Sequence, residues 1–145
     1  MLFRKCAGGV VFHGDQVFLL KNEKGEWVLP KGVVRGNASQ QEVAVMRVLV
    51  ETGVVADILE AVGETSYEFY SVTRSTPVRN RIMWYTMHAK DPGFRIAFEQ
   101  GFKDGGWYKI DEALDLITYT QDQSLVRLAY EKYKAQIAEQ IHSGR

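Results

Sequence analysis

The chain has 145 residues, with 18 lysines and arginines against 18 aspartates and glutamates, and a single cysteine, Cys6. A lone cysteine excludes an internal disulfide framework and favours the reducing cytoplasm, and no run of 18 apolar residues offers a membrane span. The zero net charge argues against bulk binding of nucleic acid, including double-stranded DNA, although it says nothing about local patches. No Gly/Ser/Pro-rich linker divides the chain, so we expect residues 1–145 to form one domain.

Short strands are expected in the first thirty residues. Apolar residues at 10–12 and 17–20 flank His13-Gly14-Asp15-Gln16, and glycine with aspartate permits the tight turn of a hairpin. A third strand is expected over 27–29, after a second turn. Pro30 ends that strand because proline lacks the N–H group that a strand donates to its neighbour.

One helix has sequence signals at both of its ends. Ser39 and Glu42 have the Ser-x-x-Glu spacing of a capping box, in which the serine oxygen accepts a hydrogen bond from the first turn. Gly53 suits the left-handed backbone conformation that commonly follows the last turn. These signals predict a helix over residues 39–52.

The rest of the chain predicts further strands and then two helices. The strand-like segments, separated by loops that are basic or contain glycine or proline, are 56–62, 65–69, 81–89 and 106–110. Asp111 can cap a helix over 112–117, and Thr120 with Gln123 can cap an amphipathic helix that runs to residue 141. This order of elements predicts an α/β fold with a mixed sheet between helical layers.

The segment from Gly32 to Val54, GVVRGNASQQEVAVMRVLVETGV, resembles the signature of the Nudix superfamily. That signature is G-x5-E-x7-R-E-U-x-E-E-x-G-U, where U is an aliphatic residue. The positions that agree are Gly32, Val48, Glu51, Gly53 and Val54. AGGVVF in the first strand and WVLPKG before the segment also resemble the family, so the likeness covers almost the whole chain. It implies a Nudix-like α/β/α sandwich with a central mixed sheet.

The likeness is weakest at the charged positions of the signature. Ala38 replaces the first glutamate of the pattern, and Met46 replaces its arginine. Arg47 and Val50 replace the second and third glutamates. Glu51 is the one signature carboxylate that is kept. In the family, the resemblance implies, these carboxylates hold divalent metal for cleavage of a nucleoside diphosphate linked to another group.

Helix geometry shows what the replacements change. Positions 47, 50 and 51 lie within about 100° of one another around a helix axis, so three carboxylates there would converge on one ion. In this chain the charges of Arg47, Val50 and Glu51 sum to zero. Arg47 and Glu51 are also four residues apart and can form a solvated ion pair, an interpretation that competes with a metal-binding role for Glu51.

Glu51 and Glu99 are the candidate catalytic residues, as metal ligands or as a general base. Mg²⁺ often needs only one or two protein carboxylates when substrate phosphates supply its other ligands. The resemblance places Glu99, within FEQGFKDGGWYKIDEAL, where many members have a late glutamate. Mg²⁺ or Mn²⁺ is therefore the expected cofactor of an active enzyme, and an inactive protein would need none. The alternative for Glu99 is an ordinary loop glutamate.

The candidates for contact with a substrate are Lys31, Arg74, Arg79, Arg81 and Tyr85. Lys31 is expected at the mouth of the predicted 39–52 helix, where it could meet a phosphate, or it is a solvated loop lysine. The segment 27–32 resembles members that act on dinucleoside polyphosphates, such as Ap4A hydrolases. The three arginines belong to a predicted loop over 71–81 without acidic residues, which suits a polyphosphate or an RNA 5′ end, or simply a solvated basic loop. Tyr85 could stack on a base or belong to the core, and the same two interpretations apply to Tyr67, Phe69, Tyr70 and Trp84.

Two functions are compatible with these patterns. The first is a hydrolase of nucleoside polyphosphates whose metal-dependent pyrophosphohydrolysis is weak or lost. The second is a non-catalytic module on the same fold, which binds or senses nucleotides or contacts another protein. Val43, Met46 and Val50 form an apolar stripe at helical spacing, which either belongs to the core or contacts a second copy of the chain in a homodimer.

Overall fold

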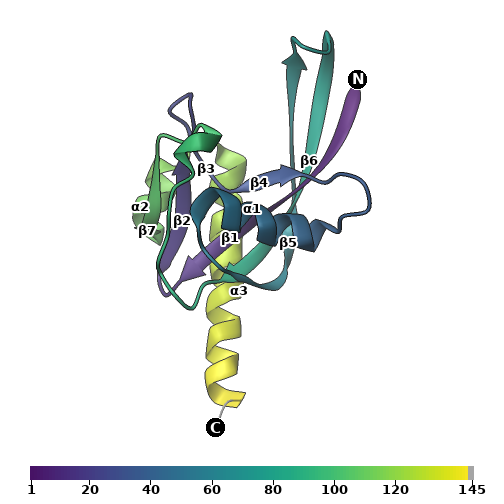
Figure 1. Cartoon of the computed structure of the whole chain (residues 1–145). Helices are drawn as coiled ribbons and strands as arrows, with labels where there is room; N and C mark the ends of the chain where they lie inside the picture. Colours follow the sequence, from purple (N-terminus) through teal and green to yellow (C-terminus); the bar gives the residue numbers. More distant parts are fainter. Residues whose placement is uncertain (144–145) are drawn as a thin grey trace.

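A computed structural model describes residues 1–143, which form a mixed sheet with helices on both sides (Figure 1). The strands are β1 (Leu2–His13), β2 (Gln16–Lys21), β3 (Trp27–Val28), β4 (Lys31–Val33), β5 (Asp57–Ser71), β6 (Thr76–His88) and β7 (Asp104–Lys109). The helices are α1 (Gln40–Thr52), α2 (Ile110–Leu116) and α3 (Thr120–Ser143), with a 3₁₀ helix at Phe98–Gln100. No helix of this described part is long and apolar enough to cross a membrane.

The sheet has the strand order β3-β2-β1-β6-β5, with β4 also pairing with β1 and β7 with β2. β1 and β6 run parallel, and the other pairs are antiparallel. The predicted α/β fold with a mixed sheet between helical layers is confirmed.

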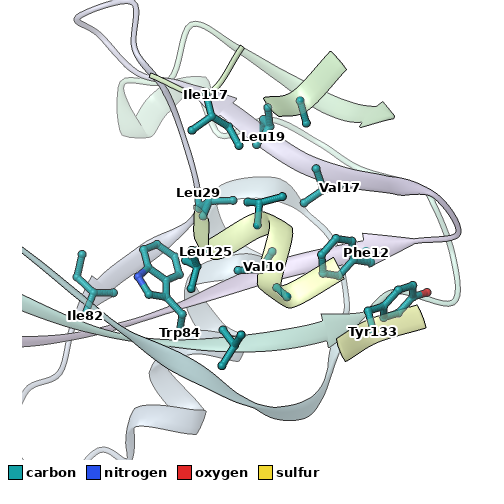
Figure 2. Close-up of a cluster of buried hydrophobic side chains, with 14 of the residues drawn as sticks. Val10, Phe12, Val17, Leu19, Leu29, Ile82, Trp84, Ile117, Leu125 and Tyr133 are labelled. Atoms are coloured by element: carbon teal, nitrogen blue, oxygen red, sulfur yellow. The ribbon is translucent and has the colours of Figure 1, made fainter. Parts of the chain in front are cut away.

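Two apolar clusters occupy the two faces of the sheet. Side chains alternate between the faces of a strand, so Val10 and Phe12 of β1 belong to the cluster beneath α2 and α3, while Val11 belongs to the cluster beneath α1. Figure 2 shows the first cluster, in which Phe12 stacks on Tyr133 of α3 with ring centroids 4.8 Å apart. Because both faces of β1 are covered by helices, its central residues are apolar without interruption.

The ends of α1 follow the predicted signals. Ser39 is the N-cap, and its Oγ accepts a hydrogen bond from the backbone N–H of Glu42 at 3.0 Å. Gly53 has φ 72° and donates its N–H to the carbonyl of Leu49 at 2.9 Å. A glycine suits this position because other residues strain in the left-handed region. The helix therefore begins and ends where the capping box and the glycine indicate.

Three local predictions are wrong. The segments 56–62 and 65–69 form one strand, β5, with irregular register near Gly63, so glycine there marks a bulge and not a turn. The segment 71–81 is largely strand, because β6 begins at Thr76 and leaves only a short turn at 72–75. Asp111 does not cap α2, which begins one residue earlier, at Ile110, without a side-chain cap.

Candidate functional site

Arg47 and Glu51 form an ion pair on the face of α1 that the signature would fill with carboxylates. Both Nε and Nη2 of Arg47 donate to Oε2 of Glu51, at 3.0 and 2.7 Å. The predicted pairing is confirmed, but the expectation that it is solvated is wrong, because the Glu51 side chain is only 5% exposed. Burial raises the pKa of Glu51, and the guanidinium of Arg47 opposes that rise. Arg47 therefore favours the ionised form of this carboxylate, as Lys31 also does.

Arg47 reaches Glu51 across a glycine of β4. A Cβ atom on Gly32 would lie 2.5 Å from Cγ and Cδ of Arg47, so a larger residue would displace the arginine stem. Nη2 of Arg47 also donates to Oε1 of Gln100, at 3.4 Å, on the 3₁₀ helix. The arginine thus lies between β4 and this 3₁₀ helix, in the place where the signature glycine leaves room.

Glu99 lies on the same 3₁₀ helix, which is held against the end of α1. The N–H of Arg95 donates to the carbonyl of Thr52 at 2.7 Å, and the N–H of Ala97 donates to the carbonyl of Glu51 at 3.1 Å. The structure therefore brings the segments of Glu51 and Glu99 together, although Glu99 itself is exposed. A catalytic or metal-binding role for the two glutamates stays a prediction.

The side chains on this face offer too few ligand atoms to coordinate a metal ion fully. Oε2 of Glu51 already accepts two hydrogen bonds from a cation, and Val50 offers no ligand atom. Within the described residues, no group of three or more histidine, cysteine, aspartate or glutamate side chains could hold a metal ion. A divalent cation would also meet the charge of Arg47, which disfavours its binding.

A cavity of about 840 Å³ opens next to this face, and the sequence did not predict it. Leu29, Ile82 and Trp84 line it, and Figure 2 shows these three residues in the adjoining apolar cluster. The other lining residues that matter here come from β5, from the turn after β2 and from the junction of α2 and α3: Tyr67, Phe69, Tyr70, Glu26, Tyr119, Gln121 and Asp122. Of the residues that the sequence offered for contact with a substrate, Lys31 and the aromatic residues Tyr67, Phe69, Tyr70 and Trp84 line this cavity.

The α2–α3 junction is joined to the other walls of the cavity by hydrogen bonds. Gln121 binds the edge of β5, accepting from the N–H of Ser66 at 3.4 Å and donating to its carbonyl at 3.2 Å. Tyr119 donates to Glu26, which raises the pKa of Tyr119 to about 12 and lowers the pKa of Glu26. These contacts hold the walls at a defined separation.

Charge is unevenly distributed around the cavity. Its acidic lining residues are Glu23, Glu26, Glu68 and Asp122, and its basic ones are Lys24 and Lys31. Lys31 lines the cavity and directly precedes Gly32, the glycine that lies against Arg47. Its charge favours the ionised forms of both Glu51 and Asp122. Burial raises the pKa of Asp122 despite this lysine. Nζ of Lys31 lies 5.8 Å from the ring centroid of Tyr67.

Of the candidates Lys31, Arg74, Arg79, Arg81 and Tyr85, Lys31 lines the cavity and the other four do not. Arg79 and Arg81 are on β6 and not in the predicted loop, and each pairs with a glutamate of β5. Arg74 lies in the short hairpin turn. Tyr85 is buried in the cluster beneath α1, on the face of β6 opposite Trp84. Burial there leaves no free ring face for a base.

Comparison with known proteins agrees with this geometry. The family model described as the NUDIX domain matches residues 2–128. The Ap4A hydrolase of C. elegans, solved as a binary complex, superposes with a TM-score of 0.66 at 18% identity, covering 92% of this chain and 98% of that one. A NUDIX hydrolase from Nitrosomonas europaea gives 0.70 at 18% identity, covering 92% and 74%. The E. coli dihydroneopterin triphosphate pyrophosphohydrolase gives 0.68 at 14% identity, covering 87% and 95%.

At these identities the solved structures establish a shared fold, and the family is established by the model that spans most of the sequence. The fold, the position of α1 and the signature glycines at 32 and 53 all agree with that match. The chain belongs to the Nudix family.

Proposed function

We propose that this protein binds nucleoside polyphosphates, including dinucleoside polyphosphates, and that its metal-dependent pyrophosphohydrolysis is weak or lost. The observation that carries the proposal is the buried Arg47–Glu51 pair, on the helix face where the family signature has carboxylates. A cytoplasmic location, suggested by the single cysteine, is part of the same proposal.

The cavity supports nucleotide binding. Tyr67, Phe69 and Tyr119 are each partly exposed at its walls and offer ring faces on which a base can stack. The cavity has more carboxylates than cations, which disfavours phosphates inside it. Lys31 lines the cavity on the side of α1 and provides a positive charge there. We therefore place the base in the cavity and the phosphates near Lys31. The family match and the Ap4A hydrolase among its structural relatives agree with this class of ligand.

The α1 face supports weak or absent cleavage. Members of the family generally use divalent metal ions, and Mg²⁺ requires several oxygen ligands in octahedral arrangement. Here Arg47 neutralises Glu51, and Val50 provides no oxygen. For any residual cleavage we propose Glu51 and Glu99 as the participating carboxylates. A non-catalytic nucleotide-binding or sensor protein is the second candidate function, and the same ion pair favours it.

Nucleotide binding is tested by thermal shift. A ligand at about one hundred times its Kd stabilises the fold by about 2.7 kcal/mol, so Tm should rise by several degrees with a dinucleoside polyphosphate or a nucleoside triphosphate. Lys31→Met should weaken binding about tenfold, since it removes the cation nearest the expected phosphates. Lys109→Met, at an exposed position outside the cavity, is the matched control. Unchanged Tm with every nucleotide tested would refute the proposal.

Catalysis is measured separately, with Mg²⁺ or Mn²⁺ and the same ligands. Binding with little or no turnover is the expected result. Fast turnover that Glu51→Gln abolishes would instead show that this carboxylate is catalytic and that the protein is an ordinary hydrolase. Because binding and turnover are recorded on the same ligands, each part of the proposal can fail independently.

A homodimer through the apolar stripe of α1 also remains a proposal. Met46 and Val50 are 55% and 38% exposed, whereas Val43 packs partly into the cluster beneath α1. We expect Met46→Glu to shift a concentration-dependent dimer to monomer in light scattering, because it buries a charge in an apolar contact. Leu128→Glu, at a similarly exposed apolar position on α3, is the control. A wild-type monomer at all concentrations would exclude the dimer.

A further inference from the structure

The β5–β6 hairpin and the first residues of β1 form a three-stranded ribbon that projects from the rest of the molecule (Figure 1). We define this ribbon as residues 1–5 and 64–81. Leu2–Lys5 pair in parallel with Val78–Arg81, which pair in turn with Ser66–Phe69 of β5. The ribbon is thus a continuation of the central sheet beyond its helical layers.

The ribbon carries a separate positive charge. It contains five of the 18 lysines and arginines but only two of the 18 aspartates and glutamates, so its formal charge is +3 and that of the remaining chain is −3. The chain is neutral as a whole, but these two regions have opposite net charges. A local excess of this kind attracts polyanions even when the whole protein is neutral.

One face of the ribbon combines three of these five cations with two aromatic rings, and the two glutamates of the ribbon, Glu64 and Glu68, lie on the same face. The register places Phe3 beside Arg79 and Lys5 beside Arg81, all on the same face as Tyr70 because side chains alternate along each strand. Phe3 and Tyr70 are 63% and 61% exposed. We call these five residues the basic-aromatic face. Only Tyr70 of the five reaches the cavity, so the other four are free of the nucleotide site.

The ion pairs on this face do not prevent a phosphate from binding. Arg79 pairs with Glu68, and Nη2 of Arg81 lies 3.1 Å from Oε2 of Glu64. The side chains of both arginines are well exposed, at 44% and 59%. Exposed pairs of this kind contribute little to stability, so a guanidinium can exchange its carboxylate for a phosphate at small cost. The glutamates meanwhile hold the two arginines in place on the strand.

We propose that the basic-aromatic face binds single-stranded nucleic acid. Arginine and lysine at neighbouring positions can contact successive phosphates of one strand, and exposed rings stack on bases. Only an unpaired strand presents its base faces, so the rings favour single strands over a duplex. A mononucleotide in the cavity would not contact Phe3, Lys5, Arg79 or Arg81, because these four residues do not line the cavity. The basic-aromatic face is therefore a second site, which shares only Tyr70 with the proposed nucleotide site.

The test is fluorescence anisotropy on the full chain, with labelled oligonucleotides of about 12 nucleotides. RNA and DNA of one sequence are compared as single strands and as duplexes, at about 50 mM salt and above. We expect single strands to bind more tightly than duplexes, and the RNA and DNA arms identify the preferred sugar. Affinity should fall with salt, and Arg79→Ala with Arg81→Ala should reduce the slope of log K against log salt by about 1.4. Lysine at both positions should largely preserve that slope.

Two matched controls separate this surface from general effects. Lys109→Ala with Arg127→Ala removes the same charge at exposed positions outside the ribbon and should leave the affinity nearly unchanged. Phe3→Ala, at a ring that is 63% exposed and does not line the cavity, should weaken binding at least about fivefold, whereas Phe98→Ala, 64% exposed outside the ribbon, should not. Thermal unfolding confirms that each variant is folded.

Several results would overturn the inference. The first is that no single strand binds at low salt, and the second is that the duplex binds more tightly than the single strand. The third is that the arginine variants keep the affinity and salt slope of their controls. The fourth is that an acidic peptide, at equal concentration of charge, displaces the oligonucleotide completely. None of them affects the thermal shift with nucleotides, which reports on the cavity.

Discussion

Replacing Arg47 with alanine is expected to destabilise the fold by about 2–3 kcal/mol near pH 8, because it leaves the buried carboxylate of Glu51 without its cation. The value is below that of a fully buried pair, since the Arg47 side chain is 30% exposed. Urea unfolding measures the change, and Arg127→Ala, at an exposed position on α3, is the control. Equal stability of the Arg47 variant and the wild type at pH 8 would contradict a structural role for the pair.

The pH dependence gives a second readout of the same change. Burial raises the pKa of Glu51, so the folded protein retains this proton at pH values where the unfolded chain has lost it. The contribution of this group to stability is therefore fully present below the ordinary carboxyl pKa and decreases as pH rises towards the folded pKa. Removing Arg47 raises that pKa further and extends the decrease to higher pH. Adding Glu51→Gln to the Arg47 variant should flatten this part of the pH profile, because the buried carboxyl group is no longer present.

Restoring carboxylates is expected to create a metal site on α1. Arg47→Glu combined with Val50→Glu changes the charges at positions 47, 50 and 51 from a sum of zero to three negatives, within about 100° on one helix face. Without metal, the repulsion should lower Tm below that of the wild type, and Mg²⁺ should raise it again. Mg²⁺-dependent cleavage of a dinucleoside polyphosphate should also increase, by about tenfold or more.

The control for this variant is Arg127→Glu with Leu128→Glu, which makes the same charge change on an exposed part of α3. It should show neither the recovery of Tm nor the cleavage. A double variant on α1 that binds Mg²⁺ but still does not cleave would show that the replaced carboxylates are not the reason for weak hydrolysis. Failure to bind Mg²⁺ at all would show that the backbone of α1 holds the three positions in another geometry.

Features that depend on nearby residues were predictable from the sequence. The capping serine and the closing glycine defined α1, since their hydrogen bonds join residues three or four apart. The Arg47–Glu51 pair followed from the helical repeat alone. The burial of Glu51 did not, because it depends on tertiary packing against α1 by β4 and by the 3₁₀ helix, which lies far from α1 in the sequence.

Strand pairing limited the remaining predictions. The basic segment at 71–81 was predicted as a loop because its partners, Glu64 and Glu68, precede it on another strand. Only the hairpin register brings Glu68 opposite Arg79 and Glu64 within reach of Arg81. The short strand β4 lacks enough residues for a periodic signal. The base-stacking candidate Tyr85 proved to face the core, since a strand directs alternate residues to opposite sides of the sheet.

The sequence by itself determined the family resemblance, the ends of α1, the loss of the signature carboxylates and the equal numbers of positive and negative residues. Only the tertiary structure decided that Arg47 holds a buried carboxylate, that a cavity opens between segments far apart in the chain, and that the balanced charge is divided between the ribbon and the body. The physical reason is that a motif is a local pattern, whereas burial and electrostatic fields arise from residues that meet only when the sheet is assembled.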